Sequence, residues 1–246
     1  MINSLSEFQH ASKQAIENPE SFWNDIANEF HWKSPWKQTL AYDFSTPEIK
    51  WFVGGKLNIT ENCLDRHLAT QPKKTAILFE PNNPTEQAQH ITYKELHSRV
   101  CQTANMLKAN GAKKGDRICM YMPMVPELAI AVLACARIGA IHSVVFAGFS
   151  ATALAARIND ALCSMLLTAD GGFRGAKTIG LKDIADEALQ SCSTVESCIV
   201  FQRTNKEVSW NPIDRWWHEE MDKVDDHFPL ISCGKPTTAL STTSAC

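Results

Sequence analysis

From residue 66 onward, short apolar runs alternate with stretches whose apolar positions repeat every three or four residues. The short runs predict buried strands at residues 75–79, 90–93, 117–122, 141–146, 164–168 and 197–201. The longer repeats predict helices at residues 128–138, 152–161 and 181–189 and along the face formed by Leu96, Val100, Ala104 and Leu107. Strands that alternate with helices favour parallel pairing. We therefore expect an α/β fold, with a mostly parallel sheet covered by helices on both faces.

Local motifs mark where several of these helices begin and end. Thr92 and Glu95 have the spacing of a capping box, which satisfies backbone amides at the start of a helix. Pro126 fits the first turn of a helix, where an N–H would have no partner. Gly111 and Gly139 follow helical stretches and predict their ends, because glycine adopts the left-handed conformation that is common there.

The first 65 residues follow a different pattern, with tryptophan and proline spread among polar segments and a helix expected at residues 6–16. Trp23, Trp32, Trp36 and Trp51 lie in this region. We interpret their rings as apolar anchors rather than as surfaces for stacking a ligand, because a tryptophan ring contributes a large apolar area to packing. The region predicts an extension that packs around a larger body.

Composition narrows the possible functions. The 246 residues are 44% hydrophobic and 21% charged, which is typical of a globular protein. A net charge of -3 without a clustered basic face argues against a nucleic-acid partner. The first ten residues lack the basic start and apolar segment of a secretory signal, and the longest apolar run, residues 128–136, is about half of the roughly 20 residues that span a bilayer. We therefore expect a cytoplasmic protein with no membrane partner.

Neither the cysteines nor the histidines have the spacing of a metal site. The nine cysteines include no Cys-x-x-Cys pair and several lie in apolar stretches, so we interpret them as reduced thiols of the core. His67, His90, His97 and His142 have no cysteine or carboxylate at ligand spacing, so we expect surface groups or hydrogen-bonded core groups. The sequence predicts no metal site, and no residue is assigned a catalytic role.

The strongest candidate site is the run Asp170-Gly171-Gly172-Phe173-Arg174-Gly175-Ala176-Lys177, which follows an apolar strand. Arginine matches phosphate oxygens with two parallel donors, and glycine allows a close approach of the backbone. Taken alone, the run is also what an ordinary solvated basic loop contains. Residues 146–150 follow a second strand, and ligands of α/β sheets bind beyond the carboxyl ends of strands. We therefore expect both loops to face one ligand cleft.

Several stretches resemble the AMP-forming acetyl-coenzyme A synthetases, in the same order along the chain. They are residues 51–58 (WFVGGKLN), 62–68 (NCLDRHL), 144–150 (VVFAGFS), 156–158 (ARI) and 173–177 (FRGAK). The similarity extends from about Phe22 to about Trp217. It implies part of the N-terminal domain of an adenylate-forming enzyme, and the stretch at residues 62–67 favours the acetyl branch over the propionyl branch.

The resemblance implies a two-step reaction with ATP, Mg²⁺ and coenzyme A. Acetate attacks the α-phosphorus of Mg-ATP to give acetyl-adenylate and diphosphate, and the thiol of coenzyme A then displaces AMP. The contacts with coenzyme A that it implies are Arg174, Gly175, Ala176 and Lys177 for the phosphates and Phe146 and Gly148 for the passage of the pantetheine arm. Ala147 and Ala176 stand where the family usually has glycine, so an added methyl could narrow the approach of the ligand.

The resemblance stops where the family's Ser/Thr/Gly-rich phosphate loop would follow. We expect an acetyl-coenzyme A synthetase-type N-terminal extension (1–65), part of an AMP-binding domain (66–229) and a divergent Ser/Thr-rich tail (230–246). Gly234-Lys235-Pro236 echoes the missing loop without the run that should precede it. This suggests a shifted reading frame or a truncated gene product, without ATP and Mg²⁺ sites and inactive by itself.

Other interpretations remain open. One is a non-catalytic interaction or regulatory module that retains a coenzyme A-phosphate loop or docks onto a full-length synthetase. Another is the N-terminal part of a different short-chain synthetase, such as a propionyl-coenzyme A synthetase. A generic dinucleotide-binding domain is disfavoured, because no Gly-x-Gly-x-x-Gly follows the first strand.

Overall fold

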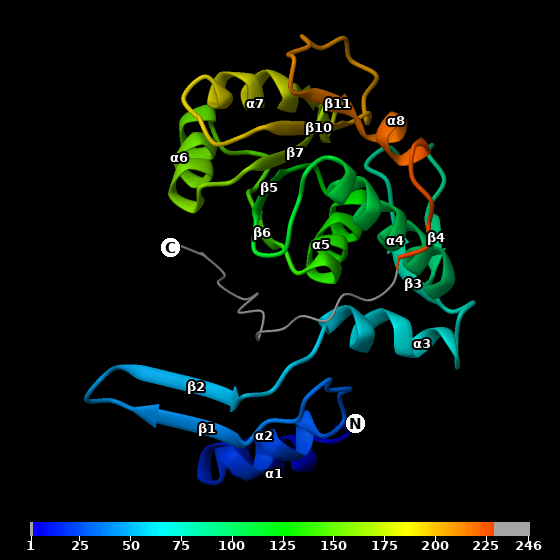
Figure 1. Ribbon diagram of the computed structural model, residues 1–246. Helices are drawn as coiled ribbons and strands as arrows, with labels where there is room; N and C mark the ends of the chain where they lie inside the picture. Colours follow the sequence, from blue (N-terminus) through cyan, green and yellow to red (C-terminus); the bar gives the residue numbers. More distant parts are fainter. Residues whose placement is uncertain (1, 229–246) are drawn as a thin grey trace. The chain divides into compact units, whose positions relative to one another are not determined.

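The computed structural model describes residues 2–228, which form two compact units, one up to Asn62 and one from Cys63 onward. The first unit contains helices α1 (Leu5–Glu17) and α2 (Pro19–Ala27) and an antiparallel hairpin of β1 (Gln38–Asp43) and β2 (Glu48–Val53) (Figure 1). The helix expected at residues 6–16 is confirmed as α1, whereas the hairpin was not expected. Its exposed strands lack a clear alternation of apolar and polar positions.

Aromatic rings hold the first unit together. The Trp32 ring lies 4.8 Å from that of Trp36 and 5.4 Å from that of Phe52. The indole N–H of Trp32 donates to the Ala27 carbonyl at 2.8 Å, so the ring is fixed by a hydrogen bond as well as by packing. These contacts favour the interpretation of the tryptophans as apolar anchors.

A five-stranded parallel sheet forms the centre of the second unit, in the order β11–β10–β7–β5–β6. Its strands are β5 (Arg117–Tyr121), β6 (Ile141–Val144), β7 (Met165–Ala169), β10 (Ser197–Phe201) and β11 (Asp214–Trp216). The main helices are α4 (Tyr93–Ala109), α5 (Pro126–Ile138), α6 (Ala151–Ala161), α7 (Leu181–Leu189) and α8 (Trp217–Asp222). A π-helical turn (Glu61–Asp65) and the short helix α3 (Arg66–Leu68) precede them.

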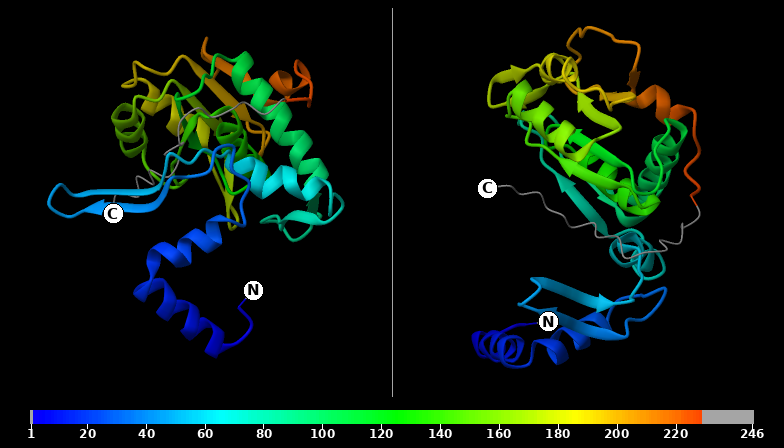
Figure 2. Two further views of the ribbon diagram at one scale, coloured as in Figure 1. Left: turned by 60° about the horizontal axis from the view of Figure 1, so that its bottom comes forward. Right: turned by 60° about the vertical axis from the view of Figure 1, so that its left-hand side comes forward.

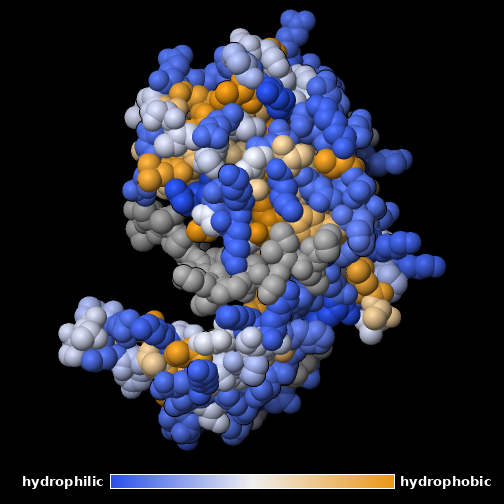
Figure 3. Space-filling view, viewed as in Figure 1, coloured by the Kyte–Doolittle hydropathy of each residue, from blue (hydrophilic) through white to orange (hydrophobic). Residues whose placement is uncertain are grey.

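Helices cover both faces of this sheet, as Figures 1 and 2 show. Alternate side chains of a strand point to opposite faces, so Ile118 and Met120 pack with α4, α5 and α8, whereas Cys119 and Tyr121 pack with α6 and α7. The expected α/β fold is therefore confirmed. On the face drawn in Figure 3, the hydrophobic side chains of this unit form patches separated by hydrophilic ones.

The predicted helix boundaries are confirmed where local motifs define them. The Thr92 hydroxyl accepts from the Glu95 amide, and the Glu95 carboxylate accepts from the Thr92 amide at 2.8 Å, which is the expected capping box. α5 begins at Pro126 and ends at Ile138, and Gly139, whose φ of 76° is left-handed, caps it.

Two of the strands that the sequence predicts do not join the parallel sheet. β3 (Thr75–Phe79) and β4 (Gln89–Thr92) pair with each other in an antiparallel arrangement, so parallel pairing is wrong for them. No helix intervenes between them, and a crossover long enough for parallel pairing is therefore missing. β8 (Gly172–Arg174) and β9 (Lys177–Ile179) form another antiparallel pair, where the sequence suggested a loop.

A partly buried ion-pair cluster fixes the beginning of the second unit. The Arg137 guanidinium, whose side chain is 2% exposed, donates to both Asp65 oxygens, at 2.8 and 3.0 Å. His97 Nε2 lies 3.2 Å from Asp65 Oδ1, and the Cys101 thiol lies 3.7 Å from the same nitrogen. His97 is therefore one of the hydrogen-bonded groups that the sequence led us to expect, with a carboxylate partner that the fold supplies from 32 residues away.

The pKa values of this cluster follow from its contacts. Burial disfavours the charge on Asp65, but hydrogen bonds from His97 and Arg137 outweigh it and lower the Asp65 pKa to about 2. The hydrogen bond to Asp65 and the contact with Cys101 raise the pKa of His97 to about 9. The charged groups of this cluster therefore have a structural role.

Candidate coenzyme A site

The topology of the sheet opens a ligand site at the carboxyl ends of β5 and β7. These strands are neighbours, but the chain leaves β5 toward α5 on one face and leaves β7 toward α7 on the other. Connections that diverge in this way leave a crevice between the two strand ends, and ligands of open α/β sheets bind there.

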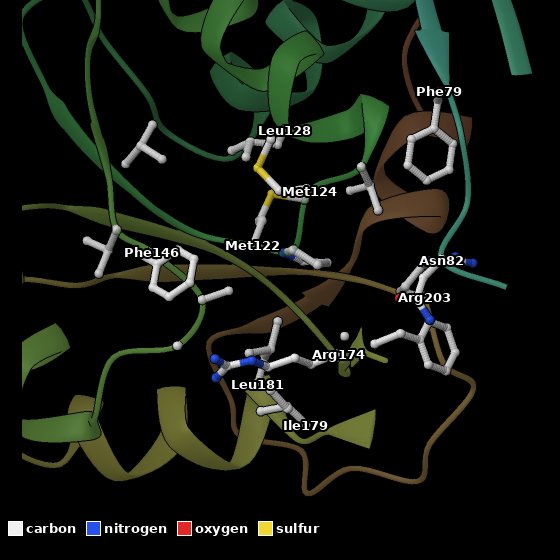
Figure 4. Close-up of a pocket in the computed structure, with 18 of the residues that line it drawn as sticks. Phe79, Asn82, Met122, Met124, Leu128, Phe146, Arg174, Ile179, Leu181 and Arg203 are labelled. Atoms are coloured by element: carbon white, nitrogen blue, oxygen red, sulfur yellow. The ribbon is translucent and has the colours of Figure 1, made fainter. Parts of the chain in front are cut away.

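A cavity of about 650 Å³ lies at this position (Figure 4). Its walls come from the segments that follow β3, β5, β6, β7 and β10, as expected for a site beyond the carboxyl ends of strands. The lining residues are Phe79, Glu80, Asn82, Met122, Pro123, Met124, Val125, Leu128, Val144, Val145, Phe146, Ala147, Gly148, Gly172, Phe173, Arg174, Ile179, Leu181 and Arg203. The expectation that the two loops face one cleft is confirmed.

Only some of the residues singled out in the sequence line this cavity. Phe146, Gly148 and Arg174 do, whereas Gly175, Ala176 and Lys177 lie at the exposed end of the β8–β9 hairpin, outside the lining. In Figure 4 the side chain of Arg174 extends toward the end of the cavity where Phe146 lies. The structure therefore combines an apolar chamber with a cationic rim.

The β8–β9 hairpin places its two cations side by side. Arg174 and Lys177 are directly opposed in the antiparallel register, with Gly175 and Ala176 as the two turn residues. Opposed residues point to the same face of a hairpin, and their Cβ atoms are about 5 Å apart. Both side chains can thus reach one polyanionic ligand, which a flexible loop would not guarantee.

The turn explains why alanine is accepted at position 176. Gly175 has φ +58°, whereas Ala176 is not among the residues with positive φ in the described part of the chain. A two-residue turn of this form requires glycine only at its first position. Ala147 likewise has no positive φ. Neither alanine causes backbone strain.

Gly171 and Gly172, at the start of the hairpin, pack closely against neighbouring atoms. A Cβ on Gly171 would lie 2.9 Å from the Ile179 carbonyl oxygen, and one on Gly172 would lie 3.1 Å from Pro123 Cβ. Both positions are buried, unlike Gly175. Packing alone thus accounts for glycine at position 171, whereas Gly172 also lines the cavity.

The loop after β6 presents Phe146 at the cavity. The Phe146 side chain is 65% exposed and packs edge-on against Phe149, with ring centres 5.9 Å apart. The Tyr121 hydroxyl donates to the Phe149 carbonyl at 2.8 Å, which anchors the loop to β5. A Cβ on Gly148 would collide with the Phe146 ring, so glycine at 148 allows this ring position.

Asp170, at the end of β7, fixes the backbone behind the hairpin. Its carboxylate is fully buried and accepts N–H groups from Gly171 at 2.6 Å, Arg203 at 2.8 Å, Thr204 at 3.0 Å and Lys206 at 3.2 Å. Amides from two separate segments thus converge on one anion, which compensates for the loss of its hydration. The sequence marks Asp170 only as part of the candidate run and does not reveal this role.

Arg203 is a cavity residue that the sequence reasoning missed. Its guanidinium carbon lies 5.0 Å from the centre of the Phe173 ring, and its Nη2 lies 3.1 Å from Glu86 Oε2. The residue follows β10, and its place beyond a strand end is the one feature that could have predicted it. Asn82 was missed as well, and no sequence pattern marks it.

The charges at the rim differ in whether the protein neutralises them. Arg203 has Glu86 as a partner, but within residues 2–228 neither Arg174 nor Lys177 forms an ion pair. The hairpin therefore offers two cations to an anionic ligand.

Within residues 2–228, no group of three or more potential metal ligands is found. None of the helices described is long and apolar enough to cross a membrane.

Comparison with known proteins places the chain in a family. Residues 64–233 match the family described as AMP-binding enzyme, and residues 8–63 match the family described as acetyl-coenzyme A synthetase N-terminus. The chain belongs to the AMP-binding enzyme family. The boundary between the two matches lies one residue from the boundary between the compact units at Asn62 and Cys63.

Curated relatives are similar over most of the chain. It is 47% identical to the acetyl-coenzyme A synthetase of Saccharophagus degradans, covering 94% of this chain and 38% of the relative. It is also 47% identical to acetyl-coenzyme A synthetase 2 of Pseudomonas putida, covering 91% of this chain and 35% of the relative. The chain thus spans less than two fifths of the length of either protein.

A solved structure supports the fold. The acetoacetyl-CoA synthetase from Streptomyces lividans superposes with a TM-score of 0.78 at 24% identity, over 89% of this chain and 34% of that one. At this identity the likeness concerns the fold alone.

Proposed function

We propose that this chain carries the coenzyme A-phosphate hairpin and part of the pantetheine passage of an AMP-forming acetate–coenzyme A ligase. The ligase would convert acetate, ATP and coenzyme A into acetyl-coenzyme A, AMP and diphosphate through acetyl-adenylate. The observation that carries the proposal is the pairing of Arg174 with Lys177 at the rim of a cavity that Phe146 and Gly148 also line. The relatives' names support the acetyl substrate.

Each group in the proposal has a physical task. Arg174 can donate two parallel hydrogen bonds to phosphate oxygens, and Lys177 adds a compact charge beside it. The apolar chamber beyond the Phe146 ring suits the uncharged pantetheine arm, which loses little hydration there. Fixing the nucleotide end at the rim would aim the thiol inward, toward the place where an acyl-adenylate is attacked.

We assign ATP and Mg²⁺ to parts of the ligase other than these 246 residues. The 246 residues by themselves are proposed not to form acetyl-adenylate, because the matched motifs concern coenzyme A rather than the ATP phosphates. The expected tail at residues 230–246 lies outside the described residues, and the match to the AMP-binding enzyme family continues to residue 233, so the similarity does not stop at about Trp217 as expected. The three-part division of the chain, the absence of nucleic-acid and membrane partners and the cytoplasmic location stay predictions.

Binding of coenzyme A tests the proposal. Two charged hydrogen bonds contribute about 3–6 kcal/mol before the cost of ordering, so the dissociation constant should be about 1 mM or weaker. In a ligand-observed NMR titration, Arg174→Ala should reduce binding of coenzyme A more than binding of the analogue that lacks the ribose phosphate. Arg215→Ala removes an exposed arginine outside the cavity lining and serves as the control.

Two outcomes of the titration would contradict parts of the proposal. Equal losses for coenzyme A and its analogue would exclude the ribose phosphate as the partner of Arg174. Unchanged binding in Arg174→Ala would refute the hairpin as the phosphate site.

Acetate-dependent exchange of diphosphate into ATP tests the catalytic part. Exchange should be at background for the 246-residue chain and should appear in a chain extended to the length of the relatives. Exchange by the short chain would refute the assignment of ATP to other parts of the ligase. Coenzyme A binding without exchange in the extended chain would instead support a non-catalytic interaction module.

A further inference from the structure

The loop between β3 and β4, residues 80–88, reaches across to the β8–β9 hairpin. The side-chain amide of Asn82 donates to the Gly175 carbonyl at 2.9 Å, although the two residues are 93 positions apart. Gly175 is the first turn residue of the hairpin. The hydrogen bond therefore attaches the tip of the hairpin, between its two cations, to another part of the second unit.

A second link connects the same loop to the hairpin through Arg203. Glu86 pairs with Arg203 at 3.1 Å, and the Arg203 guanidinium lies over the Phe173 ring. Phe173 directly precedes Arg174. In Figure 4, Asn82 and Arg203 lie at the end of the cavity opposite Phe146, away from the side to which Arg174 extends. The β3–β4 loop thus contacts the tip of the hairpin directly and is linked to Phe173 through Arg203.

The hairpin needs such support to hold its cations in one place. Each of its strands has three residues, and residues 173–178 are exposed. A two-stranded hairpin without further packing is marginally stable in water. A small tilt of the hairpin would move a guanidinium at its end by more than the narrow range that a bidentate hydrogen bond to phosphate tolerates.

We infer that the β3–β4 loop is a positioning element of the coenzyme A-phosphate site and that Asn82 is its principal positioning residue. This inference rests on the proposed function of the hairpin. Asn82 itself need not touch the ligand, because its amide holds the turn from which Arg174 and Lys177 project in register. Arg203 is already paired with Glu86 and supports the hairpin through Phe173. Arg174 and Lys177, which form no ion pair within the described residues, are available to the ligand.

The chain offers a matched pair of variants. Asn82 and Asn83 are adjacent and exposed, but the Asn83 side chain accepts hydrogen bonds from the Thr85 amide and hydroxyl, at 3.1 and 2.9 Å, inside the loop. Asn82→Ala removes the link to the hairpin, and Asn83→Ala removes a contact of similar size that does not involve it. Both positions are exposed, so each variant should fold.

Hydrogen exchange provides a readout that needs no ligand. Asn82→Ala should accelerate exchange at the amides of residues 174–177 by about two- to tenfold, the factor expected from the loss of one hydrogen bond. Exchange in the parallel sheet should be unchanged. Asn83→Ala should leave the hairpin amides as they are in the parent chain, and Asn82→Gln, which keeps the donor, should restore part of the protection.

Ligand binding tests the same element at the site. Asn82→Ala should weaken coenzyme A by about two- to tenfold and the analogue without the ribose phosphate by less, because the defect lies in the phosphate-binding cations. If Arg174→Ala impairs binding and Asn82→Ala changes neither binding nor exchange, the inference is wrong and the proposed function stands. If Arg174→Ala has no effect on binding, the proposed function itself fails, whatever Asn82→Ala does to exchange.

Discussion

Lys182 and Arg174 are cations in the same unit, but the protein treats their charges in opposite ways. The Lys182 side chain is fully buried, and its ammonium lies 2.5 Å from Asp186 and 2.8 Å from Asp214. Burial opposes this charge, yet hydrogen bonds to the two carboxylates raise the pKa of Lys182 above its ordinary value. Arg174 and its neighbour Lys177 are exposed on a hairpin, and neither forms an ion pair within the described residues.

The difference separates structural charge from charge available to a ligand. A buried ion without a partner costs several kcal/mol, so the fold must supply carboxylates wherever it buries a cation. An exposed cation keeps its hydration and needs no partner, so it can exchange water for phosphate oxygens. Two such cations fixed in register are more specific than two on a flexible chain, because less conformational freedom is lost on binding.

The largest effect should come from the buried cation. Lys182→Met leaves Asp186 and Asp214 without their shared partner and should lower the free energy of unfolding by about 3–5 kcal/mol. Lys223→Met is the matched control, because Lys223 also lies 2.5 Å from a carboxylate but its side chain is 61% exposed, and the loss should be at most about 1 kcal/mol. Urea denaturation followed by circular dichroism measures both.

A double variant keeps this test decisive if Lys182→Met does not fold. Adding Asp214→Leu removes one stranded carboxylate and should recover part of the stability. If the Lys182 and Lys223 variants lost the same free energy of unfolding, burial would not distinguish the contributions of the two cations to stability.

The pH dependence of stability comes next in size. The His97 pKa rises from 6.5 to about 9, so its stabilising effect is complete below pH 6.5 and is lost as pH rises through 9. The Asp65 pKa falls from 3.8 to about 2, so its effect is present above pH 3.8 and is lost as pH falls through 2. Stability from this cluster should therefore be greatest between about pH 4 and 6.5 and should decline by roughly 3 kcal/mol toward alkaline pH.

His97→Gln isolates this contribution. The amide keeps hydrogen-bonding capacity toward Asp65 but does not titrate, so the alkaline decline should become shallower. Urea denaturation at a series of pH values measures it, and an identical decline in His97→Gln would assign the effect to another group.

The sequence predicts the positions of the strands well because these elements are locally specified. β3 and β10 have the expected bounds, since short apolar runs of this kind have few alternatives to a buried strand. Capping residues and glycines define the helices around them. The antiparallel pairing of β3 with β4 could not be read from the runs themselves, because an apolar strand does not encode the direction of its partner.

The candidate site is only partly encoded in local sequence. The resemblance and the strand ends indicate the Arg174 hairpin and the Phe146 loop. Asn82 and the His97–Asp65 contact depend on residues that meet only after folding, so no spacing rule reveals them. Contacts between residues far apart in the sequence are thus the hardest part to predict, whereas the unpaired cations are visible in the sequence.

A smaller effect, on coenzyme A binding, should distinguish the role of Lys177 from that of Arg174. Lys177 lies outside the cavity lining that includes Arg174, so Lys177→Ala should weaken coenzyme A by about 1–2 kcal/mol and leave the free energy of unfolding within about 0.5 kcal/mol. NMR titration and urea denaturation measure the two quantities. The weakening should diminish at high salt, because exposed charges are screened. A salt-independent loss would contradict a role as a point charge.

The smallest effect should come from the turn, where two substitutions separate backbone conformation from ligand clearance. Gly175→Ala places a side chain at φ +58°, which costs about 1 kcal/mol, although a Cβ there would meet no atom within 4 Å. We expect faster hydrogen exchange in residues 172–179 and roughly fivefold weaker binding of coenzyme A. Ala176→Gly should change neither by more than about twofold, because position 176 has no positive φ to relieve. Substantially tighter binding in Ala176→Gly would mean that the ligand approaches the Ala176 methyl, so that clearance rather than backbone conformation limits the site.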